Sequence, residues 1–285
     1  MSVLFNIIGV LGISLFILLI LNFVWKYIRG KPKLSLDERW VVVTGCDSGI
    51  GQGVMEKLVA ENASVIACTY TEEGFKKAMS VGVKHALQFD LTSENASTNA
   101  AKEILELTGG RLWGLVHNAG MVQPGFVEYL RMDVFRSIFE VNFFAVIRLT
   151  QGLIPALKKA GGRLVFVSSV DGIVSLPGNA PYDSAKFAVE AFADATRVEL
   201  SFWDVFVSVI NPSTMRTPLA MSFFESHRKS WEQMNEVDPN GEWKKHFPIS
   251  WLDSYVEGGK KQLEIIAQDP KPVSYTHLRA HETND

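Results

Sequence analysis

The sequence contains few cysteines and no excess of positive charge. Only Cys46 and Cys68 occur among 285 residues, so a disulfide framework is not indicated and a reducing compartment suits the chain. The formal net charge of -3 offers no basic field for nucleic acid. Internal repeats and low-complexity blocks are also missing, while 47% of the residues are hydrophobic. We therefore predict a folded protein with a sizeable core and no nucleic-acid partner.

Charge is missing from the start of the chain. Residues 3–25 contain no charged side chain, and about 20 apolar residues suffice to cross a bilayer as a helix. A cleaved signal peptide is not favoured, because a basic start and a small-residue cleavage site are both missing. Lys26, Arg29, Lys31 and Lys33 follow the apolar run. The positive-inside rule then predicts a single-pass N-terminal anchor with the rest of the chain in the cytosol.

The two ends of the chain suggest its division into parts. We predict a transmembrane anchor at residues 1–28, a basic linker at 29–39 and a folded domain at 40–272. Residues 273–283 read like the translation of one frame of a common sequencing adapter, so the segment 273–285 is interpreted as non-native. An ordinary polar tail is the alternative.

Short apolar runs alternate with longer helical patterns in the folded domain. The six runs are WVVVTG, SVIACT, HALQFD, GLVHNAG, RLVFVSS and VFVSVINP. Continuous apolar strands separated by helices are typical of a parallel sheet covered on both faces. We predict an α/β fold, a Rossmann-like doubly wound sheet, in which ligands bind beyond the carboxyl ends of the strands.

A glycine-rich turn follows the first of these runs. The sequence TGCDSGIG places Gly45, Gly49 and Gly51 between a strand and a helix. Glycine lets the backbone approach a pyrophosphate closely, and the helix N-terminus offers unpaired N–H groups and a partial positive charge. A glycine pattern alone is weak evidence, but this position is the one that a dinucleotide-binding motif requires.

Six motifs occur in one order along the chain, namely TGCDSGIG, HNAG, VN, SSVDG, YDSAK and NPSTMRT. As a set they resemble the short-chain dehydrogenase/reductase family over roughly residues 40–217. TGCDSG, LWGLVHNAG and the apolar N-terminal run resemble its membrane-bound retinol and hydroxysteroid dehydrogenase branch. The resemblance implies an NAD(P)-dependent alcohol dehydrogenase. It also implies a seventh strand after residues 250–267, so the domain is predicted to be truncated before its last strand.

The resemblance assigns the catalytic residues to Ser169, Tyr182, Lys186 and Asn142. Tyr182 would act as the base, and Lys186, one helical turn away, would lower its pKa from about 10 and hold the nicotinamide ribose. Such a Tyr/Lys pair taken alone is most often solvated surface. Ser169 would end the fifth strand and donate to the substrate oxygen. The carbonyl of Asn142 would hold a relay water where a helix opens; a helix-kink residue is the alternative.

The same motifs imply the cofactor-binding residues. They are Gly45, Asp47, Ser48, Gly49, Ile50, Gly51, Asp90, Asn118, Ala119, Gly120, Tyr182, Lys186 and Thr217. Asp90 would hold the adenine amine, although a helix cap or a solvated strand end is the alternative. Asn118 would stabilise the centre of the sheet, and Thr217 would contact the carboxamide. Ser213 stands where the family has glycine, so the turn before Thr217 is expected to be tighter.

Cations are missing where an NADP-binding protein needs one. The 2'-phosphate requires Arg or Lys in the glycine turn or after the second strand, and residues 46–48 and 69–71 contain neither. Asp47 would repel a phosphate, so we predict NAD, with NADP less favoured. The second strand also lacks the acidic residue that would bind the 2'-hydroxyl. No metal is predicted, because His117 has no second ligand at a suitable spacing.

The segment after the last motif carries large apolar side chains. Met221, Phe223, Phe224, Trp231 and Met234 fall where the family has a mobile lid over the substrate. Adaptable apolar side chains suit a lipid-like alcohol, although a core-facing helix stripe is the alternative.

Anchor, motifs and lid together predict an endoplasmic-reticulum membrane enzyme that oxidises a retinol-type or hydroxysteroid-type alcohol with NAD. An NADPH-dependent carbonyl reductase and a non-catalytic dinucleotide-binding membrane scaffold are the alternatives. A homodimer is left open.

Overall fold

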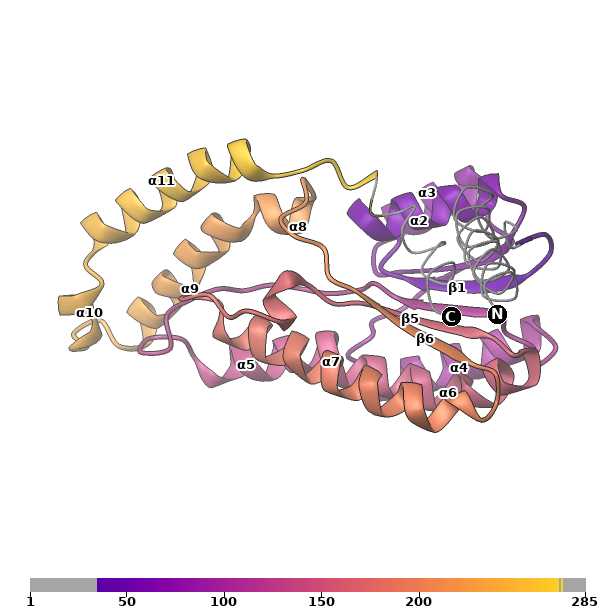
Figure 1. The fold of residues 1–285 in the computed structure, drawn as a ribbon. Helices are drawn as coiled ribbons and strands as arrows, with labels where there is room; N and C mark the ends of the chain where they lie inside the picture. The colour runs from indigo at the N-terminus through magenta and orange to yellow at the C-terminus, as the bar shows by residue number, and fades with distance from the viewer. Residues whose placement is uncertain (1–34, 272, 274–285) are drawn as a thin grey trace, which may run out of the picture. The chain divides into compact units, whose positions relative to one another are not determined.

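Six parallel strands form the centre of the structure (Figure 1). The computed structural model describes residues 35–271 and 273. The strands are β1 (Trp40–Thr44), β2 (Ser64–Thr69), β3 (His85–Gln88), β4 (Gly114–His117), β5 (Arg163–Val167) and β6 (Phe206–Ile210). They are arranged in the order β3-β2-β1-β4-β5-β6. All six predicted apolar runs are strands, so the predicted doubly wound α/β fold is confirmed.

The strand order reverses between β1 and β4. Val43 of β1 pairs with Ala67 of β2 on one side and with Val116 of β4 on the other. The crossovers on the two sides of β1 therefore run in opposite directions, and the loops that leave β1 and β4 diverge. A cleft beyond the carboxyl ends of the strands is expected at such a point.

Helices cover both faces of the sheet and extend beyond its end. The helices are α2 (Gly49–Ala60), α3 (Glu72–Val81), α4 (Glu94–Leu107), α5 (Met132–Phe139), η1 (Glu140–Phe144), α6 (Ala145–Ala160), η2 (Val170–Gly172), α7 (Ala180–Ser201), α8 (Pro218–Met221), α9 (Phe223–Val237), α10 (Trp243–His246) and α11 (Ile249–Ile266). Figure 1 shows α2 and α3 on one face of the sheet and α4, α6 and α7 on the other.

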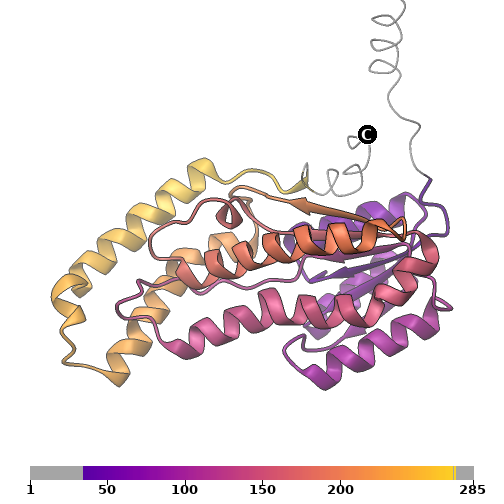
Figure 2. The ribbon, with the colours of Figure 1, turned by 60° about the horizontal axis from the view of Figure 1, so that its bottom comes forward.

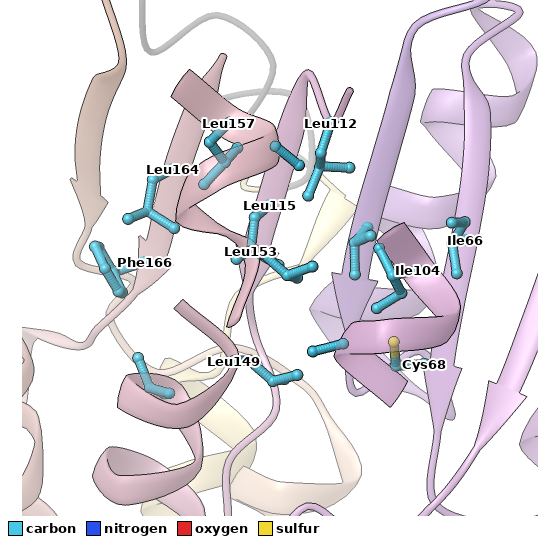
Figure 3. Packing of buried hydrophobic residues seen from close by; sticks show 14 of the residues in the cluster. Ile66, Cys68, Ile104, Leu112, Leu115, Leu149, Leu153, Leu157, Leu164 and Phe166 are labelled. Atoms are coloured by element: carbon cyan, nitrogen blue, oxygen red, sulfur yellow. The ribbon is translucent and has the colours of Figure 1, made fainter. Parts of the chain in front are cut away.

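Alternating strand residues build two separate cores, one on each face of the sheet. Figure 3 shows the first core, where Leu149 and Leu153 of α6 and Ile104 of α4 pack against Ile66 and Leu115 of the strands. The second core holds Val54 and Met55 of α2 against Val43 and Val65 of the strands. Successive strand residues point to opposite faces of the sheet. A continuously apolar strand such as β1 therefore supplies residues to both cores. Val273, which we assign to the non-native tail, packs against the second core.

The segment after the last motif, helices α8 to α11, forms its own small core. Helices α8 to α11 lie where the strands end (Figure 2). Trp231 of α9, Trp243 of α10 and Leu252 of α11 pack with Tyr129 in an aromatic cluster. Trp231 is buried in this core, whereas Phe223 lines a cavity. The core-facing alternative therefore holds for Trp231, and a lid over the substrate stays a prediction for Phe223.

One membrane-like helix occurs among residues 35–271 and 273. The continuous stretch Met132–Ala160 is long and apolar enough for a membrane span by composition. Leu149, Leu153 and Leu157 belong to the first core, so we interpret this stretch as a core helix of the domain. The predicted N-terminal anchor lies outside the described residues, as does most of the predicted non-native tail.

Candidate active site

A cavity of about 900 Å³ lies at the carboxyl ends of the strands. It is bounded by the loops after β1, β2, β4 and β5 and by helices α8, α9 and α11. All of the predicted catalytic and cofactor-binding residues line it except Gly51 and Asn142. The structure therefore brings together side chains that are far apart in sequence.

The turn between β1 and α2 has no room for a side chain at Gly45 or Gly51. Gly45 and Gly49 have φ values of 71° and 62°, in the left-handed region that favours glycine. A Cβ on Gly45 would lie 2.7 Å from Cα of Ala119, and one on Gly51 would lie 2.2 Å from Nδ2 of Asn118. Helix α2 begins at Gly49, and Ser48 forms no side-chain cap. The first N–H groups of α2 therefore border a surface that is formed by the backbone of the glycines, and such a surface suits a pyrophosphate.

Thr44 and Asn118 hold the loops after β1 and β4 together. Nδ2 of Asn118 donates to the carbonyls of Thr44 and Gly45 at 3.0 and 3.1 Å. The Thr44 hydroxyl accepts from the backbone N–H groups of Asn118 and Ala119 at 3.0 and 3.1 Å. Thr44 was missed by our sequence analysis, although it is the first residue of the glycine motif.

Asp47 reaches from the glycine turn to the end of β2. Its carboxylate accepts from the backbone N–H of Tyr70 at 3.0 Å and from that of Thr71 at 2.8 Å. It also accepts from the Thr71 hydroxyl at 2.7 Å. The acidic group that seemed to be missing after the second strand is thus supplied by another loop. Sequence spacing gave no signal of this contact.

Asp90 and Thr217 line the cavity and also form local hydrogen bonds. Oδ1 of Asp90 accepts from both the backbone N–H and the hydroxyl of Thr92 at 2.8 Å. This contact is a local turn and not a helix cap, because the N-cap of α4 is Ser93. Asp90 is exposed just after the end of β3, as the alternative of a solvated strand end has it. Thr217 is the N-cap of α8, and its hydroxyl accepts from the Ala220 N–H at 3.3 Å. A Cβ on Gly49 would lie 3.1 Å from Cγ2 of Thr217, so this threonine packs on the glycine turn.

Ser169 is presented by a short turn rather than by the fifth strand. Strand β5 ends at Val167, so the prediction that Ser169 ends it is wrong by two residues. Ser169 is the N-cap of η2, and its Oγ accepts from the Asp171 N–H at 3.1 Å. Because the oxygen accepts this bond, the hydroxyl proton can be donated to a ligand in the cavity.

Tyr182 and Lys186 lie on the first turns of α7, as predicted from their spacing. Helix α7 begins at Ala180, with Pro181 in its first turn, where proline suits the missing N–H. Nζ of Lys186 donates to the Val167 carbonyl at 2.7 Å and lies 5.5 Å from the centre of the Tyr182 ring. Both side chains line the cavity.

The protein's own groups raise the pKa of Tyr182. Burial is the main cause, the carboxylates of Asp171 and Asp183 add to it, and the Ser169 hydroxyl opposes it. Burial lowers the pKa of Lys186 to about 8, although Glu190 and Asp171 act in the opposite direction. The prediction that Lys186 lowers the pKa of Tyr182 is therefore wrong for the polypeptide alone. The physical reason is that burial removes the hydration of a phenolate.

Asn142 lies in a π-helical turn. The turn η1 spans Glu140–Phe144 and separates α5 from α6. The Asn142 side chain is buried, accepts from the Met121 N–H at 2.8 Å and donates to the Met121 carbonyl at 2.9 Å. The local opening expected at this residue is thus present, since π-turns shift backbone groups out of register. The side chain itself holds the loop after β4.

His117 is part of the core rather than of the cavity. Its ring is buried, stacks on Phe166 with the ring centres 5.3 Å apart and has Nε2 2.9 Å from the Thr150 hydroxyl. Burial lowers its pKa to about 3. Within the part of the chain that the structure describes, no group of three His, Cys, Asp or Glu side chains could hold a metal ion.

The other half of the cavity is mainly apolar. Leu219 of α8, Phe223 and Phe224 of α9 and Leu263 of α11 line it, together with Tyr255 of α11. The α11 wall could not be predicted from the sequence, because the helix carries no motif. The sequence motifs also give no role to Asp171, which lines the cavity beside Ser169.

Comparison with known proteins places this arrangement among related enzymes. The family model described as short chain dehydrogenase matches residues 39–228. Retinol dehydrogenase 7 of Mus musculus is 33% identical over 255 residues, which cover 87% of this chain and 79% of the relative. The 17-beta-hydroxysteroid dehydrogenase type 6 of Bos taurus is 34% identical over 225 residues, which cover 76% and 70%.

Solved structures share the fold. A short chain dehydrogenase from Shigella flexneri, crystallised with NADP, superimposes with a TM-score of 0.65 at 22% identity. The match covers 87% of this chain and 93% of that chain. This likeness shows that the two chains share the fold.

Proposed function

Because the chain belongs to the short-chain dehydrogenase family and is an NAD(P)-dependent alcohol dehydrogenase, we propose that it oxidises a lipid-like alcohol with NAD. The apolar half of the cavity beside Tyr182 is the main support for such a substrate. The two curated relatives are named for retinol and for a 17-beta-hydroxysteroid, which favours an alcohol of either type. A nicotinamide dinucleotide as cofactor follows from the family.

The turn that contains Gly45, Gly49 and Gly51 fits the dinucleotide. Any side chain on Gly45 or Gly51 would collide with the loop after β4, so the space above the start of α2 is kept for a group that needs close backbone approach. Ser48, Gly49 and Ile50 line that space and would hold the pyrophosphate with their N–H groups. When bound, the dinucleotide supplies the acceptor for the hydride that leaves the carbinol carbon.

Tyr182 and Ser169 are proposed to handle the substrate oxygen. Tyr182 would take the hydroxyl proton of the alcohol, and the Ser169 hydroxyl would donate to the same oxygen as charge develops on it. Lys186, held on the Val167 carbonyl, would bind the ribose. A positive nicotinamide ring next to Tyr182 would oppose the burial that raises the Tyr182 pKa. The main-chain carbonyl at Asn142 remains our proposal for the relay water.

Asp47 supports NAD over NADP. Its carboxylate lies at the end of β2, fixed by the N–H groups of Tyr70 and Thr71. A negative charge there would repel a 2'-phosphate and could accept a hydrogen bond from a 2'-hydroxyl. Carbonyl reduction is the second candidate, and one observation favours it. The raised pKa of Tyr182 keeps the phenol protonated, the form that donates a proton to a ketone.

We retain a single-pass membrane location, with the domain in the cytosol of endoplasmic reticulum membranes, as part of the proposal. Residues 3–25 support it, since they carry no charge and basic residues follow them. Asn62 and Asn95 lie in N-x-S sequons, and both side chains are exposed. Glycosylation of either asparagine in cells would contradict the cytosolic orientation.

Replacing Tyr182 by Phe tests the proposed chemistry. Tyr182→Phe should lower turnover about a hundredfold to ten-thousandfold, the usual contribution of a proton-transfer group, while the Kd for NAD stays within about threefold. Phe202→Leu is the control, because Phe202 is 87% exposed at the end of α7 and is not among the residues that line the cavity. Turnover of a retinol or hydroxysteroid at the wild-type rate by Tyr182→Phe would remove Tyr182 as the base. Faster turnover with NADP than with NAD would overturn the cofactor assignment.

A further inference from the structure

Asp183 directly follows the proposed base Tyr182, and neither the motifs nor the proposed reaction gives it a role. Its side chain is 1% exposed on the first turn of α7. Burying a carboxylate costs free energy unless hydrogen-bond donors compensate it. The start of a helix favours a negative charge, but that benefit does not require burial. The contacts of this carboxylate must therefore account for its position.

Both oxygens of Asp183 bind one turn of the chain, which begins at Leu176 and ends at Asn179. Oδ2 accepts from the backbone N–H of Leu176 at 2.8 Å, and Oδ1 accepts from Nδ2 of Asn179 at 2.7 Å. The turn is also bound to the loop after β4, because the Gly178 carbonyl accepts from the Gly125 N–H at 2.8 Å. The carboxylate therefore fixes both ends of the turn to α7.

This turn forms part of the cavity wall on the substrate side. The residues of the turn that line the cavity are Leu176, Pro177 and Asn179. A Cβ on Gly178 would lie 2.9 Å from Nε2 of His227, so the turn lies against α9. The same helix supplies Phe223 and Phe224 to the apolar half of the cavity. An alcohol that fills this half therefore meets the turn that Asp183 holds.

Side-chain packing does little to hold the turn in place. Residues 173–177 are all exposed, and Ile173, Val174 and Leu176 are each more than half exposed. A segment that buries little apolar surface opens locally at low free-energy cost. The position of the turn therefore depends on its hydrogen bonds. Those to a charged group are the stronger kind, so we expect the carboxylate to contribute most.

We propose that Asp183 is a positioning residue that fixes the turn from Leu176 to Asn179 and thereby makes the enzyme selective for large alcohols. The inference rests on the proposed function, in which a lipid-like alcohol fills the apolar half of the cavity. A compact alcohol needs only the groups around the reacting carbon. A large alcohol also contacts the cavity wall, and a wall that is already ordered lowers the free-energy cost of binding it.

Replacing Asp183 by Ala tests this role through a ratio of two substrates. The large substrate is the retinol-type or hydroxysteroid-type alcohol that the wild type oxidises, and the compact one is cyclohexanol. The ratio of their kcat/KM values, large to compact, should fall at least about tenfold in Asp183→Ala, because hydrogen bonds to a charged group are lost. The loss should appear mainly as a higher KM for the large alcohol.

The ratio separates positioning from two other effects. Asp183 also raises the pKa of Tyr182, but a change in that pKa acts on both alcohols alike and cancels in the ratio. A merely structural role would lower the two kcat/KM values together. An unchanged ratio in Asp183→Ala would therefore overturn the proposal.

Two further variants complete the test. Asp183→Asn still accepts from the Leu176 N–H but loses the bond from the Asn179 amide, so the ratio should fall less, by about threefold. This near-isosteric variant keeps the test decisive if Asp183→Ala does not fold. Asp194→Ala is the matched control, because the Asp194 side chain lies on the same helix and is 73% exposed. It should keep the wild-type ratio, and an equal fall there would overturn the proposal.

A binding measurement keeps the test independent of turnover. Calorimetry on the full chain saturated with NADH, where no alcohol can be oxidised, gives the Kd of the large alcohol. Asp183→Ala should raise this Kd at least about tenfold, while the Kd for NADH stays within about twofold. An unchanged Kd would overturn the role of Asp183 and leave the dehydrogenase assignment intact. A wild type that binds the large alcohols without oxidising them would overturn the proposed reaction instead, and the shift in Kd would still support positioning by Asp183. A wild type that binds none of them would overturn both.

Discussion

The two halves of the cavity are built in different ways. Backbone builds the dinucleotide half: left-handed glycines at 45 and 49, the start of α2 and the ends of the strands. Side chains build the substrate half, where Leu219 of α8, Phe223 and Phe224 of α9 and Tyr255 of α11 line the cavity. A backbone surface changes little when side chains change. A wall of side chains can accept many shapes of apolar ligand with few substitutions.

The same contrast appears in the polar contacts of the two halves. Asn118 and Thr44 bind backbone groups of neighbouring loops with four hydrogen bonds. In the lid core, Tyr129 and His227 bind each other at 2.9 Å, and Nε2 of His227 is buried without a hydrogen-bond partner among the described residues. We infer that the dinucleotide half is the more rigid of the two, because these four bonds between its loops oppose distortion.

Replacing one glycine by alanine in each half tests this difference in rigidity most directly. Gly51→Ala places a Cβ 2.2 Å from Nδ2 of Asn118 and 2.3 Å from the Gly45 carbonyl, so the turn must move. We expect the Kd for NAD, measured by calorimetry, to rise at least about a hundredfold, a cost within the range of core overpacking. Gly258→Ala on α11 is the matched control, since its Cβ would meet nothing within 4 Å. It should bind NAD normally and gain up to about 1 kcal/mol of stability.

Equal effects of the two alanines would contradict the comparison. If Gly51→Ala bound NAD normally, the space at Gly51 would serve only the packing of Asn118. If Gly258→Ala lost NAD binding, α11 would be coupled to the dinucleotide half through contacts beyond those described.

The difference between the halves also explains what could be read from the sequence. Gly45, Gly49 and the Tyr182/Lys186 pair act through local backbone geometry, and local geometry follows from spacing. The contact of Asp47 with Tyr70 and Thr71 joins residues 23 and 24 positions apart. It depends on how two loops meet, so spacing could not predict it. The same holds for the α11 wall and for Asp171.

The prediction of a lowered pKa for Tyr182 failed for a different physical reason. We predicted that the neighbouring Lys186 lowers the pKa of Tyr182. The two side chains are indeed close, with Nζ of Lys186 5.5 Å from the centre of the Tyr182 ring. Burial and Asp171 outweigh that effect in the structure, and Lys186 is directed to the Val167 carbonyl. Burial and hydrogen-bond direction are tertiary properties, so a one-turn spacing establishes proximity without the sign of a pKa shift.

Tyr129→Phe tests the substrate half alone. The change removes the partner of Nδ1 of His227 and leaves a second buried ring nitrogen unpaired. We expect the free energy of unfolding to fall by about 1–3 kcal/mol and the KM for a lipid alcohol to rise several-fold. The Kd for NAD should stay within about twofold. A weakened NAD affinity would show that the two halves do not act separately, and Phe202→Leu serves again as the exposed control.

Asp47→Asn tests cofactor choice in the dinucleotide half. The amide has the size of the carboxylate and can still accept from the N–H groups of Tyr70 and Thr71, but it carries no charge. We expect the ratio of kcat/KM for NADP to that for NAD to rise about tenfold, the effect of roughly 1.4 kcal/mol of removed repulsion. KM for the alcohol should not change. An unaltered ratio would mean that Asp47 only caps the end of β2.

The last test concerns stability and two buried histidines, His117 of β4 and His227 of α9. Burial lowers the pKa of His117 to about 3 and that of His227 to about 4, whereas both rings titrate near 6.5 in an unfolded chain. The unfolded state therefore binds more protons below about pH 6.5, and stability falls as pH drops from there toward the folded pKa values. Asp171 and Asp183 act in the opposite sense, because their pKa values are raised. His117→Asn should remove up to about 1.4 kcal/mol per pH unit from the slope of the unfolding free energy between pH 6 and 4. Urea unfolding at several pH values measures this slope, and an unchanged slope would mean that His117 becomes protonated without unfolding.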